Sequence, residues 1–179
     1  MITIEKAKAH LRVEHTEEDA LITSLIASAS RYIENRTGQV FDKRDGIVMI
    51  ADRLPKGSAG LELEWTPVRA VTEVAYLDTA GSKVLMPGAA IYVEKRGVYP
   101  VIYPAIDTSW PEHLSQRGGV QITINAGYEE PPADVQSAAL LIIGHLYENR
   151  ESVIIGTISS ELPMGVEMLL GPYVIHRMG

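Results

Sequence analysis

Apolar side chains recur at helical spacing in the N-terminal part of the chain and predict two helices. The apolar positions of the first helix are Ile4, Ala7 and Leu11, and those of the second are Leu21, Ile22, Leu25, Ile26, Ala29 and Ile33. Thr3 is a suitable cap for the first helix. After a break at VEHTEEDA, we expect Thr16 and Asp19 to start the second helix as a capping box and Gly38 to end it.

Between residues 39 and 131 the pattern changes to short β-rich runs separated by turn residues. The runs are GIVMIA, GLELEW, AVTEVAYL, AAIYVE, YPVIY and GVQITINAG. The stretch DTAG at 78–81 predicts a hairpin turn. Pro100, Pro104 and Pro111 predict edge strand or loop, rather than central sheet, in the middle of this region. We therefore expect a small antiparallel β subdomain inserted between helices.

A third helix is predicted from about Ala133 to Arg150, after the two prolines that precede it. Its middle, AALLIIGHLY, is apolar in every direction, so it must be covered on all sides. It is either the central core helix or partly a subunit contact. A short helix is expected over Met164–Leu170, and the apolar residues that follow form an arm held by its own domain or by a neighbour.

These elements predict an α+β fold. The helical core consists of two N-terminal helices, the long C-terminal helix and the short one, and an antiparallel β subdomain is inserted into it. The expected parts are 1–38 and 132–171 for the core, 39–131 for the β subdomain and 172–179 for a C-terminal docking arm.

Composition narrows the possible functions. The chain of 179 residues has a net charge of −7, which argues against a broad DNA-gripping surface. It contains no cysteine, which excludes disulfides, thiolate nucleophiles and sulfur-based zinc sites. The stretch MITIEKAKAH has no apolar core typical of a signal peptide, and no apolar run is long enough to span a membrane. We expect a soluble protein made in the cytoplasm.

The candidate chemical sites are weak. His145 and Glu148 share a helical face but lack the third ligand of a metal site, so they more simply mark the end of a packing helix. A second cluster of metal-ligating residue types is better explained as an exposed acidic helix start; it consists of His10, Glu14, His15 and Glu18. There is no nucleophile elbow and no phosphate-binding glycine loop. We expect no catalytic, cofactor or metal site, and no enzyme activity.

The basic pairs and the tryptophans of the β region can each be interpreted as structural residues or as binding residues. The basic pairs Lys43–Arg44 and Lys95–Arg96 are more typical of solvated hairpin ends than of nucleic-acid contacts. Trp65 and Trp110 lie beside prolines in the β region, where core or rim packing is favoured over a binding platform. What remains is an apolar helix, an apolar arm and an acidic exterior, a combination typical of a protein that binds other proteins.

Four stretches in succession resemble the head–tail connector proteins of tailed phages, also called adaptors or head-completion proteins. They are TIEKAKAHLRVEHTEEDALITSLIASASRYIENRTGQ, TPVRAVTEVAYLDTAG, AGY with the following Pro-Pro helix start and LYENRES, and LPMGVEMLLGPYVI. The resemblance extends over nearly the whole chain, except for residues 86–117.

This resemblance implies a structural virion protein that forms a ring, commonly dodecameric, beneath the portal of a DNA-filled capsid. Such a ring extends the DNA channel and provides an attachment surface for the stopper or tail terminator. DNA would pass through its lumen without sequence-specific binding. The residues that the resemblance assigns to portal docking are Pro172, Tyr173, Val174, Ile175 and His176, and those assigned to subunit contacts are Leu140, Ile143 and Tyr147.

Other readings remain open from the sequence. The main one is another virion ring protein, such as a stopper or tail terminator. A metal-dependent hydrolase using the histidine clusters and a DNA-binding regulator are less favoured, the latter because of the −7 charge.

Overall fold

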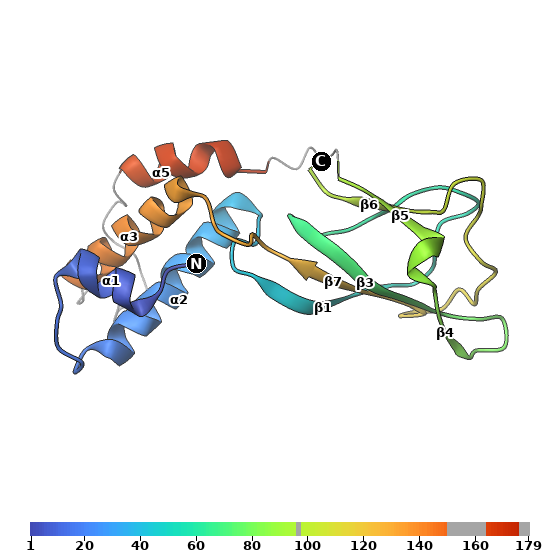
Figure 1. The fold of residues 1–179 in the computed structure, drawn as a ribbon, viewed down its shortest axis with the longest axis horizontal. Coiled ribbons are helices and arrows are strands. Elements are labelled where there is room, and N and C mark those ends of the chain that lie inside the picture. The colour runs from blue at the N-terminus through green and yellow to red at the C-terminus, as the bar shows by residue number, and fades with distance from the viewer. Residues whose placement is uncertain (96–97, 150–163, 176–179) are drawn as a thin grey trace. The chain divides into compact units, whose positions relative to one another are not determined.

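The computed structural model describes residues 1–95, 98–149 and 164–175. The chain divides into two compact units (Figure 1). The helical unit combines the two ends of the chain, Met1–Phe41 and Glu130–Gly179, and the β unit is the middle, Asp42–Glu129. Helices and antiparallel sheets occur together, so the predicted α+β fold is confirmed.

The helical unit is built around one central helix. Its described elements are α1 (Ile4–Leu11), α2 (Asp19–Thr37), α3 (Ala133–Glu148), α5 (Met164–Leu170) and a following 3-10 turn, η2 (Gly171–Tyr173). Helix α3 packs against α1, α2 and α5, which explains why its apolar residues surround it. The fully or nearly fully buried residues of α3 are Val135, Ala138, Ala139, Ile142 and Ile143.

Two of the three predicted helix boundaries at the N-terminal end are confirmed. The Thr3 hydroxyl accepts a hydrogen bond from the Lys6 backbone N–H at 3.3 Å, and Gly38 ends α2 with φ at +73°. The predicted capping box is wrong. Glu18 occupies the capping position without a side-chain cap, and the Thr16 backbone carbonyl accepts from the Asp19 N–H at 3.1 Å. A backbone turn thus takes the place of the hydroxyl.

The β unit contains a four-stranded and a three-stranded antiparallel sheet. The order of the larger sheet is β1 (Arg44–Ala51), β7 (Val120–Ala126), β3 (Val68–Leu77) and β4 (Lys83–Leu85). The order of the smaller sheet is β2 (Leu61–Glu62), β6 (Val101–Pro104) and β5 (Ile91–Glu94), with a 3-10 turn, η1 (Gly88–Ala90), before β5.

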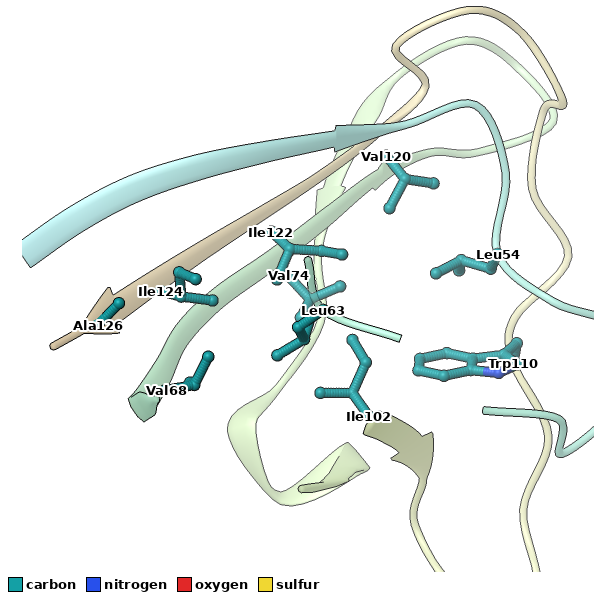
Figure 2. Packing of buried hydrophobic residues seen from close by; sticks show 10 residues of the cluster. All are labelled: Leu54, Leu63, Val68, Val74, Ile102, Trp110, Val120, Ile122, Ile124 and Ala126. Carbon is teal, nitrogen blue, oxygen red and sulfur yellow. The ribbon is translucent and has the colours of Figure 1, made fainter. Parts of the chain in front are cut away.

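A separate hydrophobic core holds the β unit together (Figure 2). Strand β7 supplies one side of it through alternate residues, as the period of a half-buried strand requires. The cluster consists of Leu54, Leu63, Val68, Val74, Ile102, Trp110, Val120, Ile122, Ile124 and Ala126. The Trp110 indole N–H donates to the Ala59 carbonyl at 2.7 Å, and Trp65 packs at the edge of the cluster. The packing interpretation of both tryptophans is therefore confirmed.

The prediction that prolines keep the middle of this region out of central sheet is wrong for β6. This strand lies between β2 and β5 in the smaller sheet. Pro100 precedes the strand and Pro104 is its last residue, so the residues between them keep their N–H groups for the ladder. A proline at a strand end costs no internal hydrogen bond.

Gly127 follows β7 in a conformation that only glycine adopts easily. Its φ is +89°, and its N–H donates to the Pro67 carbonyl at 2.9 Å. A Cβ at this position would overlap the backbone carbonyl of Asp42. The last and first segments of the β unit therefore meet backbone to backbone at Gly127.

Replacing Gly127 by alanine should destabilise the β unit by about 2–4 kcal/mol, because backbone strain and a backbone overlap add together. Gly81→Ala is the matched control. Gly81 also has a positive φ, +82°, but no atom lies near its missing Cβ, so a loss of only about 1 kcal/mol is expected. Urea unfolding followed by tryptophan fluorescence measures both, since the two tryptophans of the chain lie in the β unit. Equal losses in the two variants would contradict the role of the Asp42 overlap.

Candidate assembly surfaces

The C-terminal residues assigned to portal docking are partly engaged with their own helical unit. Pro172 and Tyr173 belong to the turn η2, and Val174 and Ile175 follow it; His176 lies outside the described residues. The Tyr173 carbonyl accepts a hydrogen bond from the Gln39 side-chain amide at 2.7 Å. The Ile175 backbone N–H donates to the carbonyl at the end of α2, that of Thr37, at 2.8 Å.

An aromatic contact strengthens this attachment. The rings of Phe41 and Tyr173 meet edge to face with centroids 5.9 Å apart, and Phe41 is completely buried. Burial, together with the nearby Asp134 carboxylate, raises the pKa of the Tyr173 hydroxyl. Residues 173–175 therefore pack and hydrogen-bond against the end of α2 and the residues that follow it. Of the two predicted ways to hold the arm, attachment to its own domain applies to these residues.

Two truncations should separate folding from docking. Ending the chain after Gly171 removes the Tyr173 and Ile175 contacts and uncovers Phe41. The free energy of unfolding should therefore fall by about 2–3 kcal/mol. Ending it after Ile175 keeps every contact described above and should leave the melting temperature unchanged. Thermal unfolding followed by circular dichroism at the helix band measures the difference. A loss of the same size in both truncations would show that residues 173–175 contribute little to the fold.

Helix α5 is fastened to α2 through one carboxylate. Glu167 accepts hydrogen bonds from Arg36 Nε and Nη2, with Nη2 to Oε2 at 2.6 Å, and from the Tyr32 hydroxyl at 3.3 Å. The hydrogen bond from Arg36 is the main cause that lowers the pKa of the Glu167 carboxyl. On the same short helix, Met164 and Met168 are 86% and 80% exposed. Thus α5 is held by Glu167 and by its buried Val166 and Leu170, while two large apolar side chains face solvent.

The Glu167 contact gives stability a defined pH dependence. Because the folded-state pKa lies below the unfolded value of about 4.5, the contribution is complete above that pH and disappears as the pH falls through the folded-state pKa. Glu167→Gln should therefore lower the melting temperature slightly at pH 7, and by progressively less as the pH falls below about 4.5. The effect is small because both partners are solvent-exposed. Glu130→Gln is a control on an exposed carboxylate. Melting curves of the three proteins between pH 3 and pH 7 provide the test, and an equal effect of Glu167→Gln at both ends of this range would refute it.

The residues assigned to subunit contacts on α3 differ in exposure. Ile143 is completely buried inside the helical unit, which argues against a direct contact of its side chain with a neighbouring subunit. Leu140 and Tyr147 are half-buried, and the Tyr147 hydroxyl donates to the Glu18 carboxylate. Only these two keep surface that a second subunit can reach. The sequence pattern could not separate them, because an all-apolar helix does not reveal which side its own domain covers.

The two histidine clusters do not form metal sites in the part of the chain that the structure describes. No group of three or more histidine and carboxylate side chains is placed there to hold an ion. His15 Nδ1 lies 2.9 Å from Glu17 Oε2, with both side chains exposed, and His15 Nε2 lies 3.9 Å from Glu18 Oε2. The His145 carbonyl accepts from the Asn149 N–H at the end of α3, in agreement with a helix end. Among the described helices, none has the length and apolar character needed to cross a membrane.

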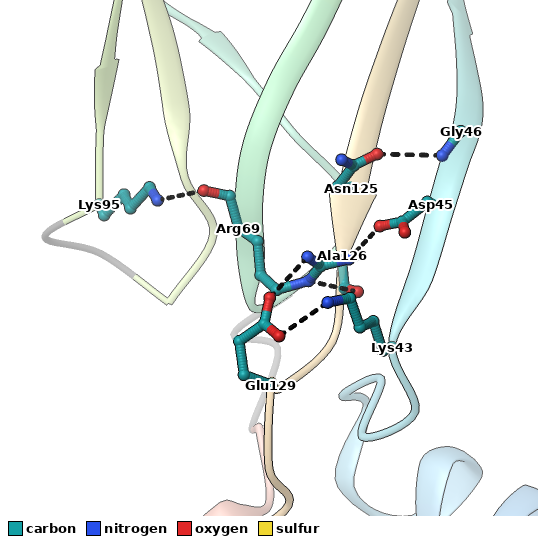
Figure 3. A network of polar contacts seen from close by, with 8 residues as sticks. All are labelled: Lys43, Asp45, Gly46, Arg69, Lys95, Asn125, Ala126 and Glu129. Atoms are coloured by element: carbon teal, nitrogen blue, oxygen red, sulfur yellow. Dashed lines mark hydrogen bonds and ion pairs between the residues drawn. The ribbon is translucent and has the colours of Figure 1, made fainter.

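A polar network occupies the end of the larger sheet where the chain enters and leaves the β unit (Figure 3). Arg69 of β3 contacts Asp45 on one side and Glu129, at 2.8 Å, on the other. Lys43 also contacts Glu129, at 2.7 Å, and this hydrogen bond is the main cause that lowers the pKa of Glu129. Lys95 donates to the Arg69 carbonyl at 2.8 Å. The lysines of the two basic pairs therefore make surface contacts within the β unit.

The sequence did not single out Arg69, Asp45 or Glu129. They are far apart along the chain, and their signal is strand register: Arg44 pairs with Ala126, and Val68 pairs with Ala126 as well. Asp45 and Arg69 each follow a residue that pairs with Ala126. Their closeness can therefore be inferred only when the strand register is known.

Comparison with known proteins agrees with this architecture. Residues 1–80 match the model of a family described as Phage gp6-like head-tail connector protein. The resemblance to head–tail connectors expected from the sequence is thereby confirmed for this part of the chain. The matched family is one of structural connectors and not an enzyme class. No curated protein matches the chain.

Similar folds occur in solved particle structures. A chain in the neck of an empty gene transfer agent particle, computed with C6 symmetry, is 24% identical with a TM-score of 0.77, and the match covers 99% of this chain and 91% of that one. The virion of the native gene transfer agent particle gives the same values. A chain in the neck of the native particle, computed with C12 symmetry, is 24% identical with a TM-score of 0.72 over 96% of this chain and 89% of that one. The whole fold, including the β unit, is therefore shared.

Proposed function

We propose that this protein is a structural head–tail adaptor of a phage-like particle. Copies of it form a ring beneath the portal, extend the DNA channel and present the surface to which the stopper or tail terminator attaches. The protein acts at the head–tail interface of the virion and catalyses no reaction.

The observation that carries the proposal is the extent of the fold similarity to chains of gene transfer agent necks, 99% of this chain at a TM-score of 0.77. The connector family model adds an independent match over residues 1–80. The symmetries of the neck structures, C6 and C12, support a ring, and the second supports a dodecamer.

The physical character of the chain supports the same role. A ring closed by rotation needs two different contact surfaces on every copy. Leu140 and Tyr147 on α3 are candidates for one of them. The net charge of −7 favours a lumen along which DNA slides, because like charges disfavour tight binding.

Docking to the portal is assigned to the C-terminal arm, with its contacts beginning at Pro172. A chain that ends after Ile175 keeps the described contacts of Tyr173 and Ile175, so its loss of docking would be separate from the loss of these contacts. His176 is the first residue after Ile175 and remains a docking candidate.

Particle assembly tests this function directly. Cells that produce particles without this protein should accumulate DNA-filled heads that lack tails, since the attachment surface is missing. Supplying the full chain should restore complete particles, and the chain ending after Ile175 should fold but restore few of them. Electron microscopy and the titre of complete particles are the measurements. Normal particles in the absence of the protein would overturn the proposal, and attachment of the protein to tail tubes alone would favour a tail terminator.

A further inference from the structure

The second half of strand β1 is an edge of the larger sheet that no described strand covers. The strand pairs with β7 on one side, and no other described strand lies on its other side. Near its start, a register irregularity and the charged Arg44 and Asp45 resemble the devices that protect sheet edges. Further along, Val48 and Ile50 are 54% and 68% exposed, with no charged residue between them. Such an edge is a template for pairing with another strand.

The opposite edge of the same sheet carries a matching exposed residue. Leu85 of β4 is 57% exposed. The register pairs Ile50 with Gln121, Gln121 with Ala75, and Ala75 with Leu85. Ile50 and Leu85 therefore end a single row across the sheet, and both residues lie on the same face because directly opposed residues share a face.

The neighbouring rows of paired residues also have complementary residues at their two ends. In the next row, Ala51 pairs with Val120, which pairs with Tyr76, and Tyr76 pairs with Val84. Ala51 and Val84 therefore lie at the two ends of this row. One residue further, the Leu77 N–H donates to the Gly119 carbonyl at 3.0 Å, and Leu77 pairs with Lys83. Asp52 follows Ala51 on the other edge and accepts from the Gly118 N–H at 3.1 Å. Asp52 and Lys83 thus stand at opposite ends of this row with opposite charges.

We propose that the β1 edge of one copy pairs with the β4 edge of the next copy, so that Ile50 meets Leu85, Ala51 meets Val84 and Asp52 meets Lys83. The direction of the strands permits it. The four strands alternate in direction, so β4 of a copy related by rotation about an axis along the strands runs antiparallel to β1. The contact is heterologous, as closure of a ring requires.

A groove beside β1 provides room for the neighbouring strand. Its volume is about 380 Å³, and its lining residues include Ile50, Ala51, Leu61, Trp65 and Ile122. Val84 lies on the face opposite to Leu85 because side chains alternate along a strand. When Val84 of one copy lies beside Ala51 of the other copy, its side chain points into the apolar groove of that other copy.

This inference rests on the proposed ring, and cysteine cross-linking tests it separately. The chain has no cysteine, so Ile50→Cys with Leu85→Cys introduces the only thiols. Within one copy these positions are three strand spacings apart, about 14 Å, which is too far for a disulfide. Mild oxidation of purified particles should therefore produce a ladder of covalent oligomers of this chain on non-reducing gels. Val48→Cys with Leu85→Cys, offset by two residues along β1, should yield at least fivefold less.

The outcomes separate the interface from the function. Particles that contain the protein but give no Ile50–Leu85 cross-links overturn the edge pairing and leave the adaptor role standing. Dimers from Ile50→Cys alone would mean that two β1 edges meet, which also overturns it. Particles that never contain the protein overturn the adaptor role and the pairing together.

A charge placed on the edge gives a second measurement. Ile50→Asp should keep the melting temperature of the isolated protein within about 2 °C, since the side chain is exposed, but should reduce its incorporation into particles at least tenfold. Ile106→Asp is the matched control, because Ile106 is 85% exposed in the same unit and outside the proposed interface. Equal incorporation of the two variants would overturn the proposal.

Discussion

The antiparallel pairing of β1 with β7 is the constraint on which the rest of the structure depends. One strand begins the inserted unit and the other ends it, so their pairing brings the two ends of the insertion together. The contact of Gly127 with the Asp42 backbone and the contact of Lys43 with Glu129 secure the same place. Without this pairing, an insertion between α2 and α3 would separate helices that must pack together.

The helical unit shows how far periodicity carries a prediction. The positions of α1, α2, α3 and α5 follow from apolar spacing and from Gly38, because a helix buries one stripe and glycine accepts a positive φ. The failed capping box at Thr16 shows the limit. A threonine before a helix can serve through its hydroxyl or through its backbone carbonyl, and the spacing of residue types does not distinguish the two.

The β unit was harder to predict, because sheets depend on register. Alternation identified the strand runs, whereas the partners of each strand depend on contacts between residues far apart in the chain. The proline rule failed for β6 because position within the strand matters more than the presence of proline. For the same reason the Arg69 network and the shared row of Ile50 and Leu85 were invisible before the strand order was known. The roles given to the arm and to α3 came from a family resemblance, and they remain predictions.

The Lys43–Glu129 ion pair, 2.7 Å long, has a consequence for how this architecture can change. Lys43 lies at the start of the inserted unit and Glu129 at its end, so the two ends of the insertion are close together whatever the length of the chain between them. Strands or loops can be gained or lost beyond that point while the two ends of the insertion stay together. The scaffold can thus lengthen or shorten its inserted sheets to suit a new neighbour while its helical packing stays the same.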